Sequence, residues 1–255
     1  MAVIGIDLGT TNSLAGVWQD GKVVLIPNAF GEYLTPSVVS IGKNQEVFVG
    51  SVAKEMLATQ PYDTFREFKR NMGTNFLYGN GRKKYRAEEL SAFVLRRLKE
   101  DAEKFLGEEV TEAVISVPAY FDDNKRNATK NAGRLAGLKV ERLINEPSAV
   151  ALKHHTAEKG AESFIVFDFG GGTLDVSLVE AFDNVVEIQA VAGDNYLGGK
   201  DFNEIIAQDF YEQNQISEAY LTKNEQENVL KEAEAVKKEL TDKNEAERQV
   251  YIKGE

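Results

Sequence analysis

The chain has 255 residues, 42% of them hydrophobic and 28% charged, a composition that excludes disordered, fibrous and membrane-spanning classes. Its formal net charge of -11 would repel a phosphate backbone, and it has no cysteine for a disulfide, a zinc site or a redox centre. The apolar opening from Ala2 to Ile6 lacks the basic flank of a signal peptide and the length of a membrane span. We therefore expect no nucleic-acid partner, no membrane partner and a cytoplasmic location.

The N-terminal segment alternates apolar and polar residues as β-strands do, over residues 3–6, 14–18 and 23–26. A Gly/Thr turn and an Asp-Gly turn separate the three runs, so they predict a three-stranded meander. Trp18 lies on the inner strand, and we expect its side chain to belong to the core.

The middle of the chain alternates helices and strands. Residues 88–106 carry apolar side chains at helical spacing, and residues 122–135 predict a second, polar-faced helix. Residues 114–118 are typical of a buried strand ended by proline, and Pro147 suits the first turn of a helix that runs to Lys153. This alternation predicts an α/β fold.

The second part of the chain repeats the plan of the first. Segment 154–162 has no apolar period and is predicted to link two lobes. Strands are then expected at 164–167, 176–179 and 185–191, with Asp168 in the place of Asp7, which indicates an internal duplication. Near the end, Thr222 and Glu225 form a capping-box pattern that opens a charged helix to about residue 240.

Two loops in corresponding positions suit a phosphate group. Residues 7–12 read Asp-Leu-Gly-Thr-Thr-Asn, and a tight turn there lets backbone N–H groups and the hydroxyls of Thr10 and Thr11 converge on an anion. Alone, this loop fits equally well a hairpin turn capped by its Asp. Residues 168–173 read Asp-Phe-Gly-Gly-Gly-Thr, and the three glycines leave room for a polyanion. The second copy favours a phosphate site over a pair of simple turns.

These loops and three other segments resemble the signature motifs of the 70-kDa heat-shock (DnaK-type) chaperones, in their N-terminal nucleotide-binding domain. The matching segments are residues 4–13, 117–121, 145–147, 168–175 and 193–201. They occur in the family's order, so the resemblance covers residues 3 to about 241. The short stretch between Arg70 and Glu88 is more similar to the HscC-type subgroup.

The resemblance implies an α/β actin-like ATPase fold, with two duplicated ribonuclease-H-like lobes around a nucleotide cleft. Lobe I is expected over 1–160, with a core of 1–36 and 111–160 and an inserted subdomain at 37–110. Lobe II is expected over 161–255, with a core of 161–199 and the start of an upper subdomain at 200–255. Because the family's domain continues further, lobe II is expected to be C-terminally incomplete and to expose an apolar patch. The 255-residue chain on its own is expected to bind ATP much more weakly than the full nucleotide-binding domain.

The resemblance also implies roles for single residues. Asp7 and Asp168 would hold Mg²⁺ through water, Lys69 would lie beside the γ-phosphate, and Glu146 would orient water near the metal. The implied catalytic set is Lys69, Glu146, Asp168 and Thr173, with Asp175 as a further acidic residue near the site. The implied nucleotide-binding residues are Gly9, Thr10, Thr11, Asn12, Gly170, Gly171, Gly172, Thr173, Glu234, Lys237 and Thr241.

Plainer alternatives for these residues remain open from the sequence alone. Lys69 fits a solvated surface cation, and Glu146 fits a carboxylate favoured at a helix N-terminus. Glu234 and Lys237, spaced i and i+3, would form only a weak surface ion pair. Pro118 and Arg126 match family residues that relay the nucleotide state, although a strand-ending Pro and a surface Arg are equally adequate.

The implied function is ATP binding and hydrolysis by a stress-response chaperone. Water would attack the γ-phosphate of Mg-ATP, with K⁺ as an additional ion, and the nucleotide state would control an attached domain that binds unfolded client polypeptides. A J-domain co-chaperone and a nucleotide exchange factor are the implied protein partners. Two alternatives share the fold: a sugar kinase, and an actin- or MreB-like filament ATPase.

Overall fold

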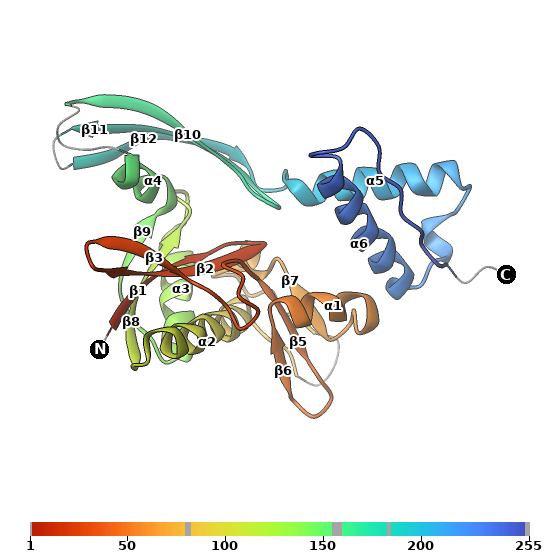
Figure 1. Ribbon diagram of the computed structural model, residues 1–255, viewed down its shortest axis with the longest axis horizontal. Coiled ribbons are helices and arrows are strands. Elements are labelled where there is room, and N and C mark those ends of the chain that lie inside the picture. The colour runs from red at the N-terminus through yellow and green to blue at the C-terminus, as the bar shows by residue number, and fades with distance from the viewer. Residues whose placement is uncertain (1, 80–82, 155–159, 183–184, 253–255) are drawn as a thin grey trace.

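The structure, a computed structural model, describes residues 2–79, 83–154, 160–182 and 185–252. Its strands form three sheets with helices packed on or beside them, so the predicted α/β class is confirmed. Figure 1 shows the largest sheet and its helices on the left, a second sheet above them, and two C-terminal helices on the right.

The largest sheet has the strand order β3-β2-β1-β8-β9, with the short β4 pairing to β2. Strands β1 to β3 are antiparallel, which confirms the predicted meander, and β8 and β9 extend the sheet as parallel strands. The strand bounds are β1 Ala2–Leu8, β2 Asn12–Gln19, β3 Lys22–Ile26, β4 Thr35–Pro36, β8 Val110–Val117 and β9 Lys139–Asn145.

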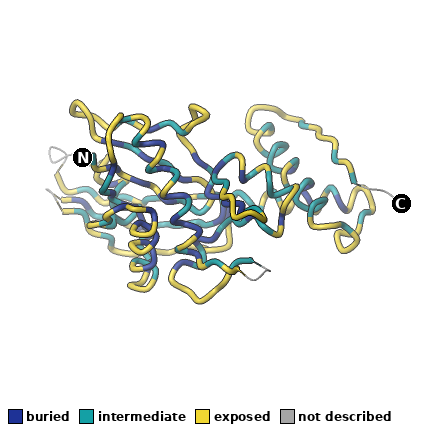
Figure 2. Tube along the Cα trace, turned by 90° about the horizontal axis from the view of Figure 1, so that it is seen from below, coloured by how far each residue is buried: buried dark blue, intermediate teal, exposed yellow. Residues whose placement is uncertain are grey.

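Helices α2 (Ala87–Leu106) and α3 (Asp123–Leu135) pack with this sheet and close its core. α2 ends where Gly107 adopts a left-handed φ of 70°, and α3 begins where the Asp122 side chain accepts the Lys125 N–H at 2.9 Å. Alternate side chains of β1 and β8 fill the core, and Figure 2 shows most buried residues gathered in this part of the molecule.

A small antiparallel sheet with the order β6-β5-β7 lies between β3 and α2 in the chain, and the sequence analysis did not predict its elements. Val39 and Phe68 are buried there in the same hydrophobic cluster as the large sheet. The bounds are β5 Val38–Ile41, β6 Val47–Val49, α1 Ser51–Thr59, β7 Thr64–Arg66 and the 3₁₀-helix η1 Phe68–Asn71.

The second sheet repeats the N-terminal plan with the antiparallel strands β10 (Glu162–Phe169), β11 (Leu174–Phe182) and β12 (Val185–Asp194). Asp7 in β1 and Asp168 in β10 occupy the same next-to-last position of their strands. In the first sheet β1 also pairs with β8, whereas among the described residues β10 pairs with β11 alone.

Helix α4 (Glu146–His154) connects β9 to the second sheet and packs against β11 and β12. Helices α5 (Gly199–Gln213) and α6 (Lys223–Glu239) pair with each other around a small core of their own. The predicted capping box at Thr222 and Glu225 opens α6, as expected.

One expectation from the sequence is wrong. Trp18 is 69% exposed, because it pairs with Val23 on the face of β2 that is opposite to the buried Val17. The predicted linker, residues 154–162, falls between α4, which ends at His154, and β10, which begins at Glu162, and its residues 155–159 lie outside the described part. The predicted lobe boundaries stay a prediction.

Candidate functional site

The first predicted loop turns tightly between β1 and β2. A Cβ atom built on Gly9 would lie 2.0 Å from the Asn12 carbonyl oxygen, so only glycine fits this turn. Ser37 stabilises the loop with two hydrogen bonds: its N–H donates to the Thr11 carbonyl at 2.8 Å, and its hydroxyl donates to the Gly9 carbonyl at 2.8 Å. Ser37 was not predicted from the sequence, because it lies 28 positions from Gly9 and no local sequence pattern links the two.

The second predicted loop lies against the first. A Cβ atom built on Gly171 would lie 2.2 Å from Thr11 Oγ1, so the two loops make direct contact through the glycine. The turn is closed by the Gly170 N–H, which donates to the Thr173 carbonyl at 2.9 Å. Backbone bonds from Gly199 to Gly170 at 3.0 Å and from Lys200 to Gly171 at 2.8 Å tie this loop to the start of α5.

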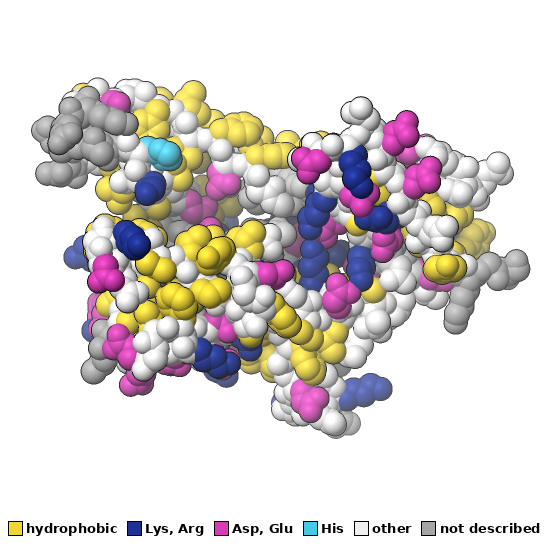
Figure 3. Space-filling model, in the orientation of Figure 1, with side chains coloured by type: hydrophobic (Ala, Val, Ile, Leu, Met, Phe, Trp, Pro, Cys, Tyr) yellow, Lys and Arg dark blue, Asp and Glu magenta, His cyan; other side chains and the backbone are white. Residues whose placement is uncertain are grey.

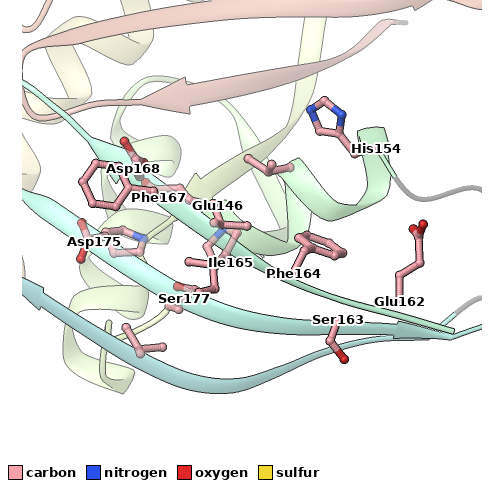
Figure 4. Close-up of a pocket in the computed structure, with 16 residues that line it drawn as sticks. Glu146, His154, Glu162, Ser163, Phe164, Ile165, Phe167, Asp168, Asp175 and Ser177 are labelled. Carbon is pink, nitrogen blue, oxygen red and sulfur yellow. The ribbon is translucent and has the colours of Figure 1, made fainter.

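Acidic side chains gather beside the loops. The Ser116 hydroxyl donates to Asp7 Oδ1 at 2.8 Å, which orients this carboxylate at the end of β1. Burial and then the charge of Asp7 raise the pKa of Asp168. Burial, followed by the charges of Glu146 and Asp168, raises the pKa of Asp175 to about 6. Figure 4 shows Glu146, Asp168 and Asp175 at the same end of a pocket beside β10.

Lys69 supplies a buried positive charge within this acidic group. Its Nζ lies 2.8 Å from Glu146 Oε1, with side-chain exposures of 8% and 18%. Burial raises the pKa of Glu146, and Lys69 opposes that rise. Lys69 Nζ also lies 5.9 Å from the centre of the Phe121 ring. The plain alternative of a solvated surface cation is therefore wrong for Lys69.

One cavity of about 510 Å³ collects most of the predicted residues. A second cavity of about 790 Å³ shares Glu146 and Asp168 with it and runs along β10 (Figure 4). Among the predicted residues, the first cavity is lined by Asp7, Gly9, Thr10, Thr11, Asn12, Lys69, Glu146, Asp168, Gly170, Gly171 and Thr173.

Four predicted residues do not line that cavity. The Gly172 carbonyl instead accepts a hydrogen bond from Arg70, and Lys237 donates to the Gly199 carbonyl behind the second loop. Burial alone would raise the pKa of Glu234, but hydrogen bonds from Lys238 and Lys54 outweigh it and lower the pKa to about 2. Thr241 follows α6, with its N–H bonded to the Lys238 carbonyl at 3.2 Å.

The residues present suit a nucleotide polyphosphate and a hard cation. The glycines keep side chains out of the space between the loops, and carboxylates whose like charges repel one another lie beside it. No group of three or more His, Cys, Asp or Glu side chains in the described part of the chain is placed to hold a metal ion directly. The predicted arrangement, in which Asp7 and Asp168 hold Mg²⁺ through water, fits an ion that commonly keeps several of its water ligands.

Positive side chains gather in the hollow between the left and right parts of the molecule, with acidic side chains among them (Figure 3). Arg126 donates to Asn145 Oδ1 at 2.7 Å and so contacts the residue that precedes Glu146. Within the described ranges, no helix has both the length and the apolar character needed to cross a lipid bilayer.

Residues 3–80 and 77–254 match the model of a protein family described as Hsp70 protein. The chain belongs to the Hsp70 family. The predicted actin-like ATPase fold is consistent with the mixed sheet and helices seen here. Hsp70 family membership supports a chaperone nucleotide-binding domain, and members of the family in general bind ATP or ADP with Mg²⁺, act as ATPases, and interact with client proteins and co-chaperones.

Proposed function

We propose that this chain binds Mg-ATP with the phosphates between its two glycine loops and hydrolyses it to ADP and phosphate. The observation that carries the proposal is the buried ion pair of Lys69 and Glu146, which lines the same cavity as both loops and Asp168. A buried cation beside crowded carboxylates is costly for a fold unless a ligand uses those charges. A bound polyphosphate would bring further negative charge to Lys69, and its metal ion would bring positive charge to the repelling carboxylates.

Each side chain has a separate task in this proposal. Thr10, Thr11 and Thr173 offer hydroxyl donors, and the loop backbones offer N–H groups, to the phosphate oxygens. Lys69 neutralises charge that develops as the attacking water oxygen bonds to the γ-phosphorus and the bond to the β–γ bridging oxygen breaks. Glu146 accepts a hydrogen bond from that water and orients it.

A bound Mg²⁺ ion, held through water by Asp7 and Asp168, would neutralise phosphate charge. Glu234, Lys237 and Thr241 are proposed to reach the adenosine from α6 and its end. Because these three lie outside the cavity that holds the loops, the proposed adenosine position extends from that cavity toward α6.

The finer biological role follows the family. We propose that the nucleotide state controls binding and release of unfolded polypeptide in an attached domain, with a J-domain co-chaperone, an exchange factor and K⁺ as further partners, in the cytoplasm. Pro118 and Arg126 would relay that state. The family match supports this role over a sugar kinase or a filament subunit. The HscC-like subgroup stays a prediction.

Asp168→Asn tests the proposal. Because the carboxylate acts through a hydrated metal ion on the reacting phosphate, kcat for ATP hydrolysis should fall by about 100-fold, while the Kd for ADP changes by less than about tenfold. Asp209→Asn, an exposed change on α5, is the matched control and should leave both unchanged. Equal losses in hydrolysis and ADP binding would contradict the metal role.

A further inference from the structure

The turn that carries Lys69 begins in an unusual backbone conformation. Glu67, between β7 and η1, has φ 57° and ψ 19°, in the left-handed region that residues with a Cβ atom rarely adopt. Such a conformation persists only where the surroundings hold it in place. The side chain of Glu67 makes contacts that can hold the turn in this conformation.

Glu67 joins two cations that come from different parts of the molecule. Its Oε2 lies 2.8 Å from Arg70 Nη1, within the same turn, and 3.2 Å from Lys200 Nζ, on the first turn of α5. The Arg70 side chain is only 15% exposed, and those of Glu67 and Lys200 are 25% and 29% exposed. Partly buried ion pairs of this kind are screened less than surface pairs.

Arg70 makes a second connection, from the turn that carries Lys69 to the second glycine loop. Its Nη2 donates to the Gly172 carbonyl, and a Cβ atom built on Gly172 would lie 2.5 Å from that nitrogen. Its guanidinium carbon lies 5.6 Å from the centre of the Tyr196 ring. Since the Lys200 N–H is bonded to the Gly171 carbonyl, both connections from Glu67 and Arg70 end at the same glycine loop.

We propose that Glu67, Arg70 and Lys200 form a clasp that positions the second glycine loop relative to the turn carrying Lys69. The three are positioning residues, and they act through the carbonyls of Gly171 and Gly172 and through the backbone around Lys69. This inference rests on the proposed function, because the loop that the clasp holds is the one proposed to bind phosphates. It adds a reason why Gly172 is a glycine although it does not line the cavity: its missing side chain leaves room for Arg70.

Arg70→Gln tests the clasp through the phosphate part of the nucleotide. The variant should bind ATP and ADP about tenfold more weakly than the unaltered chain, the effect of losing one charged hydrogen bond, and should hydrolyse ATP more slowly. Adenosine has no phosphates, so its affinity should not change. Arg70→Lys keeps a positive charge beside Glu67 and should recover part of the loss. ATP affinity and turnover equal to those of the unaltered chain would overturn the clasp.

Arg96→Gln is the matched control. Arg96 lies on α2, and its Nη2 also donates to a backbone carbonyl, that of Leu135 at the end of α3, at 2.8 Å. It should leave nucleotide affinity unchanged.

Hydrogen exchange without nucleotide separates failure of the clasp from failure of the proposed function. The amides of Gly199 and Lys200, bonded to the second loop, should exchange faster in Arg70→Gln than in the unaltered chain or in Arg96→Gln. If the unaltered chain bound no ATP, the proposed function would be wrong, and the exchange result alone would decide the clasp. Unchanged exchange at both amides would reject it.

Discussion

Asp7, Glu146, Asp168 and Asp175 crowd around the buried cation Lys69, and this arrangement has a cost at neutral pH. Burial and mutual repulsion raise the pKa values of Glu146, Asp168 and Asp175, so their charged forms are disfavoured in the folded chain. A site built to hold a metal ion and a polyphosphate is expected to destabilise the fold when neither is bound.

Asp175→Asn measures that cost. The pKa of Asp175 is raised from 3.8 to about 6, so the stability linked to this group is fully present below about pH 4 and is lost as the pH rises through about 6. Asn carries no charge at either pH, so in Mg-free buffer the variant avoids this loss. After allowance for solvent screening, its free energy of unfolding should exceed that of the unaltered chain by about 1 kcal/mol at about pH 7.5 and by almost nothing at about pH 4. Urea titrations at the two pH values check this, and an equal difference at both would contradict it.

The residues of the site were predictable to different degrees from the sequence. The two loops carry their own signal together, because an Asp followed by a Gly/Thr turn ends a predicted strand twice in the chain, whereas one copy alone fits a simple hairpin turn equally well. Lys69 had no local signal: its ion pair joins residues 77 positions apart, and only the family resemblance pointed to it. Glu67 and Lys200 gave no signal at all, since their pairing exists only once η1 and α5 are brought together.

At the scale of elements, Gly133 on α3 lies directly against β9. A Cβ atom built on Gly133 would lie 2.3 Å from Val140 Cγ2 and 3.7 Å from Ile115 Cδ1. The absent side chain therefore sets how near α3 comes to the sheet that carries Asp7 and whose strand β9 leads into Glu146.

Gly133→Ala should destabilise the chain by about 1–3 kcal/mol through overpacking, despite the better helix propensity of Ala. Val140→Ala in the same chain removes the obstructing methyl group, and the double variant should be more stable than the sum of the two single changes predicts. Gly42→Ala is the control, because its nearest neighbour would lie 3.7 Å away. Thermal or urea denaturation gives the comparison, and strictly additive losses would show that the two residues are not in conflict.

Three helices were predicted with bounds close to those found: α2 from its apolar period, α3 as a polar-faced helix and α6 from its capping box. The small sheet of β5, β6 and β7 was not, because its strands have three or four residues each and depend on pairing across the chain. Trp18 was misplaced for a related reason: alternation shows that β2 has two faces, but not which face the helices cover.

At the scale of the whole molecule, the second sheet has an apolar surface without cover in the described part of the chain. Ile165 and Phe167 on β10 are 67% and 66% exposed, and β10 is an edge strand of its sheet. Exposed apolar edge strands favour association with other chains. The expected apolar patch on the second lobe is therefore present.

Self-association of the purified chain is the expected result. Sedimentation or light scattering should show an average mass that rises with concentration, and a variant with both Ile165→Lys and Phe167→Lys should lose most of that rise. Trp18→Lys, which changes an equally exposed apolar residue on the first sheet, is the control and should not have this effect. A monodisperse unaltered chain over the whole concentration range would show that this surface does not associate.

A crystal structure of the chain with Mg²⁺ and ADP would show directly whether one nucleotide lies between the two glycine loops. We expect the phosphates between residues 9–12 and 170–173, the metal ion beside Asp7 and Asp168 with water ligands between, and Lys69 still paired with Glu146. Phosphates bound elsewhere, such as in the larger cavity along β10, or no bound nucleotide at saturating concentration, would contradict it.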